Sequence, residues 1–254
     1  MGLLHLDFET YGVLDLKKAG LYRYLSHPRT ELLLAQWAVD DSPIQVQEAS
    51  SQTVLSPELE ALVRDSRHYI VAFNAAFERA ALKFLCGIDL PPERFICTQA
   101  LAYHFSYAGS MSQVCDQLEL PQDLRKMGAD GRSVMLKFAK PRRPSQLDPS
   151  TRWNKHNASS DWPAFLQYAE FDVVASRAIW AYFADRYPDY LRTYWWAEER
   201  PLWVIDQRIN ERGWPLDSQL VSRACVLYLA LKTRMREALD QLTGLANSNS
   251  RDQF

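Results

Sequence analysis

The sequence contains few cysteines and no cysteine motif. Its four cysteines, Cys86, Cys97, Cys115 and Cys225, form no Cys-x-x-Cys pair, and no histidine spacing completes a tetrahedral zinc set. A disulfide framework is not expected in a chain of 254 residues, because such frameworks mainly stabilise much smaller secreted domains. The cysteines are therefore interpreted as buried or idle thiols in a reducing compartment.

Long apolar segments are also lacking. The first ten residues carry no cationic stretch and reach an acid at Asp7, and the apolar run 226–231 is far too short to cross a bilayer. We therefore expect a cytoplasmic protein with no membrane partner.

No excess of one charge runs through the whole chain. It has 29 Lys and Arg against 31 Asp and Glu, with 47% hydrophobic and 24% charged residues, which excludes disorder, collagen and coiled coil. One local excess exists: between Arg125 and Lys155 there are nine Lys or Arg and two acids. This segment is either a solvated charged face or a rim that contacts phosphates, and only a nearby active site would favour the second.

Strands alternate with helices in the first half of the chain, which is typical of an α/β domain. Ser56 followed by Pro57 is a good helix start, because serine caps helices well and proline fits the first helical position. Strands are expected over 3–8, 31–39, 44–47, 69–73 and 95–98, and helices after Pro57, over 75–85, from 99, over 161–185, 190–212 and 218–243.

Two acids share one face of the first strand. Because alternate residues of a strand point the same way, Asp7 and Glu9 project opposite to Leu4, Leu6 and Phe8. Two neighbouring carboxylates repel each other, so a cation is expected beside them. The alternative is that the strand simply emerges into solvent at Asp7.

A third acid, Glu78, follows the strand 69–73 and lies in the first turn of the next helix, at its fourth position if Asn74 is the N-cap. Residues just past the carboxyl end of a strand face the crevice where α/β proteins bind ligands. A favourable interaction with the helix dipole is the alternative interpretation of Glu78.

A fourth acid interrupts the apolar face of the long helix. Asp172 shares the 3- and 4-residue spacing of Phe165, Ala175, Ile179 and Tyr182, so it needs a partner such as a metal or a basic side chain, unless this part of the helix grazes solvent. Tyr168 lies one turn earlier and also follows this spacing, so its hydroxyl can reach the same place.

These acids together predict a metal site. Clusters made only of carboxylates suit hard cations, Mg²⁺ or Mn²⁺, and two such ions would balance four acids. Two metals about 4 Å apart are a known arrangement for in-line attack on a phosphodiester.

Three short motifs resemble, in the same order, the three exonuclease motifs of the DEDD superfamily. They are Asp7-Phe-Glu9-Thr10, Asn74-Ala-Ala-Phe77-Glu78 and Tyr168-x-x-x-Asp172. The tyrosine is similar to that of the subclass that proofreads in family A DNA polymerases. The resemblance covers residues 1–186 and implies a ribonuclease-H-like mixed β-sheet flanked by helices, followed by a helical C-terminal segment.

The resemblance also implies roles for individual residues. Asp7 would bridge two ions, Glu9 and Asp172 would hold the ion that activates water, and Glu78 would serve the second ion. Tyr168 would orient the attacking water. Thr10, Asn74 and Phe77 would contact the terminal nucleotide, and Arg142 and Arg143 are the candidate backbone-binding residues of the basic segment. In the family the second motif usually ends in Asp, and here Glu78 is one methylene longer.

The segment 199–217 resembles the connection between exonuclease and polymerase in bacterial and phage family A enzymes, and 242–254 resembles the start of the thumb region. We therefore expect a 3′-5′ exonuclease domain over 1–190 and a helical segment over 191–254, with no polymerase activity from this chain alone. The expected substrates are single-stranded DNA or frayed 3′ ends, with a polymerase domain of the same parent chain as a second partner, in the cytoplasm of a bacterium or of a phage-infected host.

Two other functions remain open from the sequence. One is a free-standing exoribonuclease of the same superfamily, because the metal chemistry does not distinguish the sugar 2′-hydroxyl. The other is a non-catalytic nucleic-acid-binding module in which the basic segment does the binding.

Overall fold

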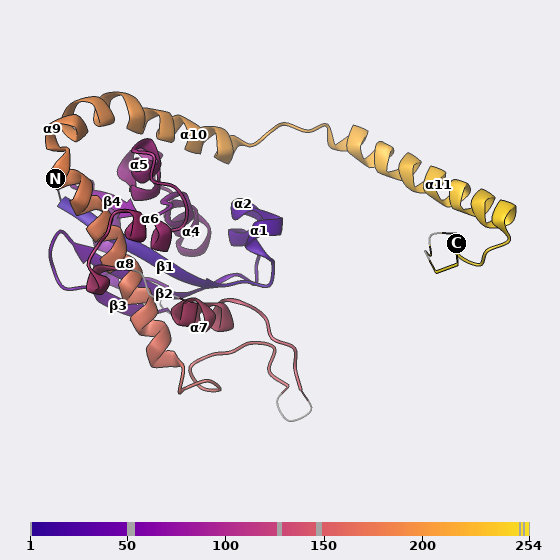
Figure 1. The fold of residues 1–254 in the computed structure, drawn as a ribbon, viewed down its shortest axis with the longest axis horizontal. Coiled ribbons are helices and arrows are strands. Elements are labelled where there is room, and N and C mark those ends of the chain that lie inside the picture. Colours follow the sequence, from indigo (N-terminus) through magenta and orange to yellow (C-terminus); the bar gives the residue numbers. More distant parts are fainter. Residues whose placement is uncertain are drawn as a thin grey trace. The chain divides into compact units, whose positions relative to one another are not determined.

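A mixed sheet of five strands, in the order β3-β2-β1-β4-β5, forms the centre of the fold (Figure 1). The computed structural model describes residues 2–49, 54–125, 129–145, 149–248, 250 and 252–253. Strand β1 pairs antiparallel with β2 and parallel with β4, which in turn pairs parallel with β5. The strands are β1 Gly2–Tyr11, β2 Glu31–Val39, β3 Gln45–Glu48, β4 His68–Ala72 and β5 Phe95–Cys97.

Helices cover both faces of this sheet, so the predicted mixed sheet flanked by helices is confirmed. Among the described residues, the α-helices are α1 Leu16–Ala19, α2 Leu21–Leu25, α3 Pro57–Arg64, α4 Ala76–Cys86, α5 Thr98–His104, α6 Met111–Gln117, α7 Ala129–Ala139, α8 Trp162–Arg186, α9 Pro188–Tyr190, α10 Arg200–Arg212 and α11 Ser218–Thr243. The described residues also form two 3-10 helices, η1 Pro92–Arg94 and η2 Gln122–Leu124, and a π-helix, η3 Leu191–Glu199.

The N-cap of α3 is the predicted residue, whereas the N-cap of α4 is one residue later than predicted. Ser56 caps α3, because its side chain accepts a hydrogen bond from the Leu59 N–H. At α4 the N-cap is Ala75 rather than Asn74, so Glu78 is the third helical residue and not the fourth. Asn74 instead adopts a left-handed conformation, with φ of 66°, and forms the turn before the helix.

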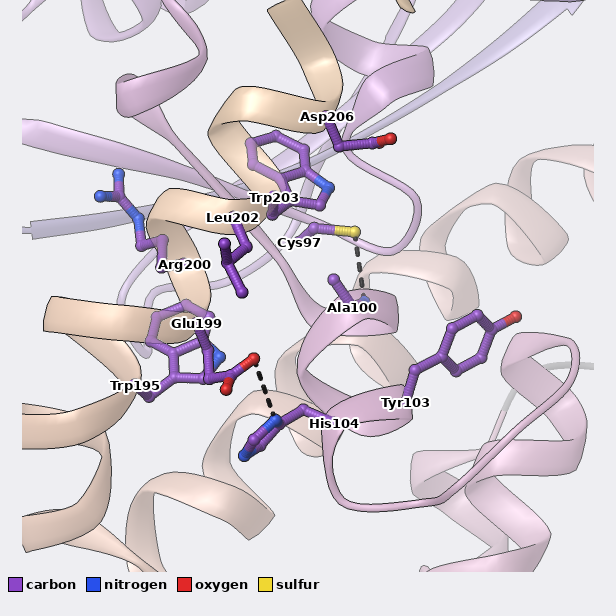
Figure 2. A pocket seen from close by; sticks show the side chains of 10 residues that line it. All are labelled: Cys97, Ala100, Tyr103, His104, Trp195, Glu199, Arg200, Leu202, Trp203 and Asp206. Carbon is purple, nitrogen blue, oxygen red and sulfur yellow. Dashed lines mark hydrogen bonds and ion pairs between the residues drawn. The ribbon is translucent and has the colours of Figure 1, made fainter. Parts of the chain in front are cut away.

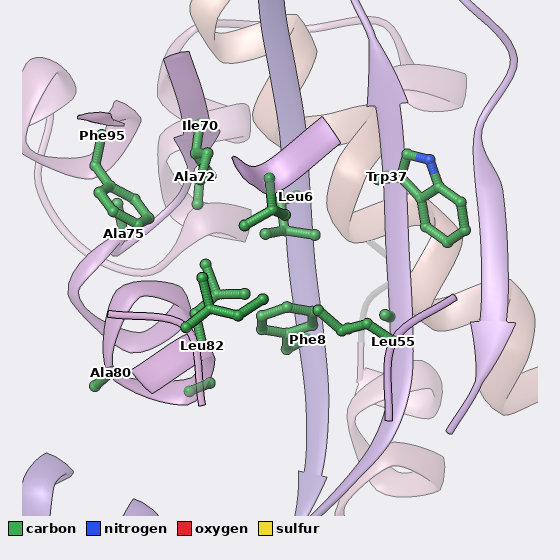
Figure 3. Packing of buried hydrophobic residues seen from close by; sticks show 14 of the residues in the cluster. Leu6, Phe8, Trp37, Leu55, Ile70, Ala72, Ala75, Ala80, Leu82 and Phe95 are labelled. Atoms are coloured by element: carbon green, nitrogen blue, oxygen red, sulfur yellow. The ribbon is translucent and has the colours of Figure 1, made fainter. Parts of the chain in front are cut away.

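The two faces of β1 have different neighbours. Leu6 and Phe8 pack with Ile70, Trp37 and Leu82 in an apolar core on the side of α2, α3 and α4 (Figure 3). Helix α8 packs against β1 and β2. Its apolar residues form two further clusters, one with the β4 and β5 residues that face it and one with β2 and α7. The acid-bearing face of β1 therefore lies beneath α8.

The chain separates into two compact units, Met1–Glu211 and Arg212–Phe254. The first unit extends beyond the predicted boundary at residue 190, because Leu191 and Trp195 of η3 join its core and Trp203 of α10 packs against it. The functional division into 1–190 and 191–254 stays a prediction. Within the second unit, α11 has no buried residue.

Across the described parts of the chain, no helix is both long and apolar enough to span a membrane. No membrane-spanning segment is therefore recognised there.

Candidate metal centre

Strand β1 brings its two acids under helix α8. Asp7 is half-buried and Glu9 is 8% exposed, so β1 does not simply emerge into solvent at Asp7. The register between β1 and β2 shifts between Glu9 and Thr10, where Leu33 is the extra residue on β2. Such bulges redirect side chains, and this one lies directly beside the second acid.

Helix α8 places its acid on the buried side. Asp172 is 4% exposed and Tyr168, one turn earlier, is 2% exposed, so this part of the helix does not graze solvent. Phe165, Ala175 and Ile179 of the same predicted stripe are fully buried. The stripe is therefore the packing face of α8, and the packing holds Asp172 toward the sheet.

Three of the predicted ligands come together. One ligand atom each from Asp7, Glu9 and Asp172 lies within 4.8 Å of the other two. This spacing suits carboxylates that share a divalent cation, which prefers oxygen ligands. The three acids fit a hard cation, although their role as ligands stays a prediction.

Glu78 lies beside this cluster and is enclosed by protein. Burial raises its pKa well above the usual range, and the negative charges of Asp7, Glu9 and Asp172 raise it further, while a backbone hydrogen bond opposes them. Its Oε2 is buried and has no hydrogen-bond partner within the described residues. A buried carboxyl oxygen without a partner, next to three other carboxylates, is an arrangement that a cation would stabilise.

The hydrogen-bond partner of Asp7 on β2 was missed by the sequence analysis. Gln36, opposite Asp7 on β2, donates from Nε2 to Asp7 Oδ2 at 2.5 Å. The signal was available, because Gln36 is the one polar residue between Leu32 and Val39. His5 shares the face of Asp7, and burial followed by the charge of Arg177 lowers its pKa to about 4, so it is neutral near pH 7.

A cavity of about 380 Å³ adjoins the acid cluster at Glu9. Thr10 and Phe77, two of the predicted nucleotide contacts, line it together with Glu9. Asn74 is exposed and is not among the lining residues. Three cations, Lys17, Arg132 and Lys140, also line the cavity, and none of them forms an ion pair within the described part of the chain.

The basic segment is largely held by contacts within the protein. Lys137 forms an ion pair with Asp161, Arg152 with Glu31 and Lys155 with Glu48. The Arg142 guanidinium lies 3.9 Å from the centre of the Trp153 ring. Arg143 is exposed, and neither Arg142 nor Arg143 lines the cavity beside Glu9, so their predicted contact with nucleic acid stays a prediction.

A second cavity, of about 440 Å³, lies between α5 and the helical run η3-α10 (Figure 2). Its walls are mainly aromatic and acidic, with Trp195, Trp203 and Asp206 among them. His104 Nδ1 faces Glu199 Oε2 there at 3.3 Å. None of the predicted site residues lines this cavity, and no cluster of potential metal ligands was found there among the described residues.

The chain was compared with known proteins. No protein-family model matches it. Over its whole length it is 29% identical to a DNA polymerase of Bacillus phage SP02, and it spans 38% of that polymerase. Among solved structures, Brucella melitensis NrnC bound to pGG aligns with a TM-score of 0.51 and 15% identity, covering 84% of this chain and 86% of the other. NrnC with bound Mg²⁺ aligns over the same shares with a TM-score of 0.50 and 17% identity.

The fold is thus that of the ribonuclease-H-like nucleases. The match to a phage DNA polymerase, together with this fold, confirms the predicted resemblance to a 3′-5′ exonuclease domain of such polymerases.

Proposed function

We propose that this chain is a two-metal-ion 3′-5′ exonuclease that hydrolyses phosphodiester bonds at the 3′ end of DNA, the proofreading part of a family A DNA polymerase. The observation that carries the proposal is the convergence of Asp7, Glu9 and Asp172 within 4.8 Å, beside the buried Glu78. The similarity to a phage DNA polymerase supports it, and so does the fold shared with NrnC, which is known with bound Mg²⁺.

Asp7, Glu9 and Asp172 would hold one Mg²⁺ or Mn²⁺ ion, and Asp7 with Glu78 a second. When bound, such ions lower the pKa of water and stabilise the negative charge that develops on the phosphate. Glu78 is a longer side chain than the aspartate usual in the family. Its burial beside Asp7 supports a role as a direct ligand.

Tyr168 would hold the attacking water in line with the scissile phosphorus. The packing of α8 keeps its ring 2% exposed and one turn from Asp172, so the hydroxyl loses little freedom on substrate binding. Correct positioning of a nucleophile can account for a large share of rate enhancement. A phenol hydroxyl can both donate and accept a hydrogen bond, which suits it to this positioning role.

The 3′-terminal nucleotide would lie in the cavity beside Glu9. Phe77 offers an aromatic surface against which a base or sugar can pack, and Thr10 offers a hydroxyl. Tyr24 Oη lies 3.0 Å from Thr10 Oγ1 and therefore fixes that hydroxyl at the cavity wall. The exposed cations Arg132 and Lys140 are placed to contact phosphates, a contact that fixes the substrate without reading its sequence.

The direct test uses single-stranded DNA labelled at its 5′ end, with Mg²⁺, with Mn²⁺ and with excess chelator. A ladder that shortens stepwise from the 3′ end, absent in chelator and in Asp7→Ala, is expected. Full cleavage in chelator would contradict the metal mechanism. Release of the 5′ label as the first product would contradict the direction.

An RNA strand of the same sequence tests the substrate class. Slower cleavage of RNA than of DNA is expected. Faster cleavage of RNA would favour a free-standing exoribonuclease. Tight binding of both strands with no cleavage under any metal would favour the non-catalytic binding module.

A further inference from the structure

Gln36 is a fully buried amide in an otherwise apolar stretch of β2. It is 0% exposed, and the antiparallel register places it directly opposite Asp7. Directly opposed residues of two strands project to the same face, so Gln36 also lies beneath α8. Its Nε2 donates a hydrogen bond to Asp7 Oδ2 at 2.5 Å, and hydrogen bonds to an ionised acceptor are stronger than those between neutral groups.

The orientation of the amide follows from this contact. An ionised carboxylate only accepts hydrogen bonds, so Nε2 must face it, because Oε1 in that place would bring two acceptors together. Oε1 then points into the protein, where it is buried and has no hydrogen-bond partner among the described residues. A methionine of similar size would pack here without leaving a buried carbonyl oxygen unsatisfied. The benefit of glutamine is therefore its contact with Asp7.

The charge of the donor matters as much as its position. Lysine or arginine beside Asp7 would offset the negative charge that attracts a divalent cation. The amide of Gln36 fixes one carboxylate oxygen without adding charge.

We propose that Gln36 is a positioning residue for the metal centre: it holds the Asp7 carboxylate so that a ligand atom stays within reach of Glu9 and Asp172. The inference rests on the proposed function only in that these acids bind a divalent cation. Groups that hold a metal ligand through a hydrogen bond typically change metal affinity or activity by about 10- to 100-fold when they are lost.

Gln36→Met tests this by removing the hydrogen bond while keeping the side-chain length. The chain supplies a matched control in Gln207, which is 4% exposed and donates from Nε2 to Asp206 Oδ2 at 3.1 Å on α10. Mn²⁺ binding is titrated by electron paramagnetic resonance of the free ion, and single-turnover cleavage of DNA is measured at saturating Mn²⁺. Circular dichroism and thermal melting verify that each variant is folded at the assay temperature.

We expect Gln36→Met to bind Mn²⁺ about 10- to 100-fold more weakly, while Gln207→Met binds it as the wild type does. At saturating Mn²⁺ the cleavage rate of Gln36→Met should return to within about threefold of wild type, because a bound cation restores the carboxylate geometry. A general packing defect would not separate metal affinity from rate in this way. Wild-type Mn²⁺ affinity in Gln36→Met, or an equal loss in Gln207→Met, would overturn the proposal.

If Gln36→Met does not fold, Gln36→Asn replaces it, because its amide is one methylene too short to reach Asp7. It must show the same loss of Mn²⁺ affinity, and normal affinity would overturn the proposal. A wild-type protein that binds no Mn²⁺ would also overturn it. A wild-type protein that binds Mn²⁺ but cleaves no DNA would contradict the proposed function. The Mn²⁺ affinity of Gln36→Met would then still test the proposed role of Gln36.

Discussion

Two glutamates near helix α4 have opposite surroundings. Glu78, in the first turn, lies among Asp7, Glu9 and Asp172, and burial and these charges raise its pKa. Glu211, at the end of α10, lies 2.5 Å from both the Arg79 and the Lys83 side-chain nitrogens, and these hydrogen bonds lower its pKa.

The difference shows what each place in the fold can do. Glu211 has its counter-charges supplied by α4 itself, so it joins α10 to α4 as a structural ion pair. The acids around Glu78 bring negative charge together inside the protein, an arrangement that calls for a cation. Carboxylates whose pKa is raised by neighbouring acids, like Glu78, are candidates for a functional role. Carboxylates paired with basic side chains, like Glu211, hold helices together.

The largest expected effect is that of Asp7→Ala, which removes the acid proposed to hold both ions. Turnover of single-stranded DNA should fall by at least about 100-fold, more than for any other single acid of the centre, because one preorganised electrostatic contact contributes on this scale. Steady-state cleavage with Mg²⁺ and with Mn²⁺ measures it. Glu211→Ala, which removes the acid paired with Arg79 and Lys83, is the control. An Asp7→Ala enzyme with near-normal turnover would place the active site elsewhere.

Asp172→Ala and Tyr168→Phe should differ in metal affinity, because Asp172 is proposed as a metal ligand and Tyr168 as a residue that positions water. Tyr168→Phe keeps the ring and its packing, so turnover should fall by about 10- to 1000-fold with Mn²⁺ affinity nearly unchanged. Asp172→Ala should lose both rate and Mn²⁺ affinity. Paired Mn²⁺ titration and single-turnover cleavage distinguish them. The assignment of Tyr168 fails if its variant loses metal as Asp172→Ala does.

Stability as a function of pH tests the comparison of the two glutamates directly. The raised pKa of Glu78 means that metal-free folded protein keeps a proton there that the unfolded chain has lost, so the free energy of unfolding falls as pH rises from about 4.5 toward the folded pKa. Glu78→Gln should remove this fall. Urea unfolding from pH 4 to 8 in chelator measures it.

Glu211→Gln should behave in the opposite sense. The pKa of Glu211 is lowered, so the stability it adds is fully present above its ordinary pKa of about 4.5 and is lost as pH falls through the folded pKa. Glu211→Gln should therefore be less stable than wild type at pH 7, and the difference should shrink in acid. Parallel curves for the two variants would mean that their surroundings do not differ as proposed.

The smallest effect is expected from the basic segment. Neutralising Arg142 and Arg143 as glutamines should weaken binding of all DNA sequences alike and flatten the dependence of binding on salt, with turnover of saturating DNA preserved. Arg132 and Lys140, which line the cavity beside Glu9, give the comparison pair. An unchanged salt slope for Arg142 and Arg143, with a reduced one for Arg132 and Lys140, would assign the phosphate contacts to α7 and its end instead.

Sequence alone determined several of the longer strands and helices and the identity of the candidate acids. Strand β2 was predicted at its observed bounds, because a short apolar run bounded by turn residues is typical of a buried strand. The alternation in β1 separated Leu6 and Phe8 from Asp7 and Glu9, since that separation follows from the pleat of any strand. The short helices α1 and α2 were not predicted, because four or five residues are too few to show a helical period.

Only the tertiary structure decided which charges have partners and which residues meet. The basic segment was a single positive stretch in the sequence, and folding paired Arg152 with Glu31, which is remote from it along the chain. The contact of Gln36 with Asp7 required the register of β1 against β2, and a shift of one residue would have turned Gln36 to the other face. Local patterns fix which way a side chain points along its own element, but the neighbours that set its charge and its chemistry are brought by packing.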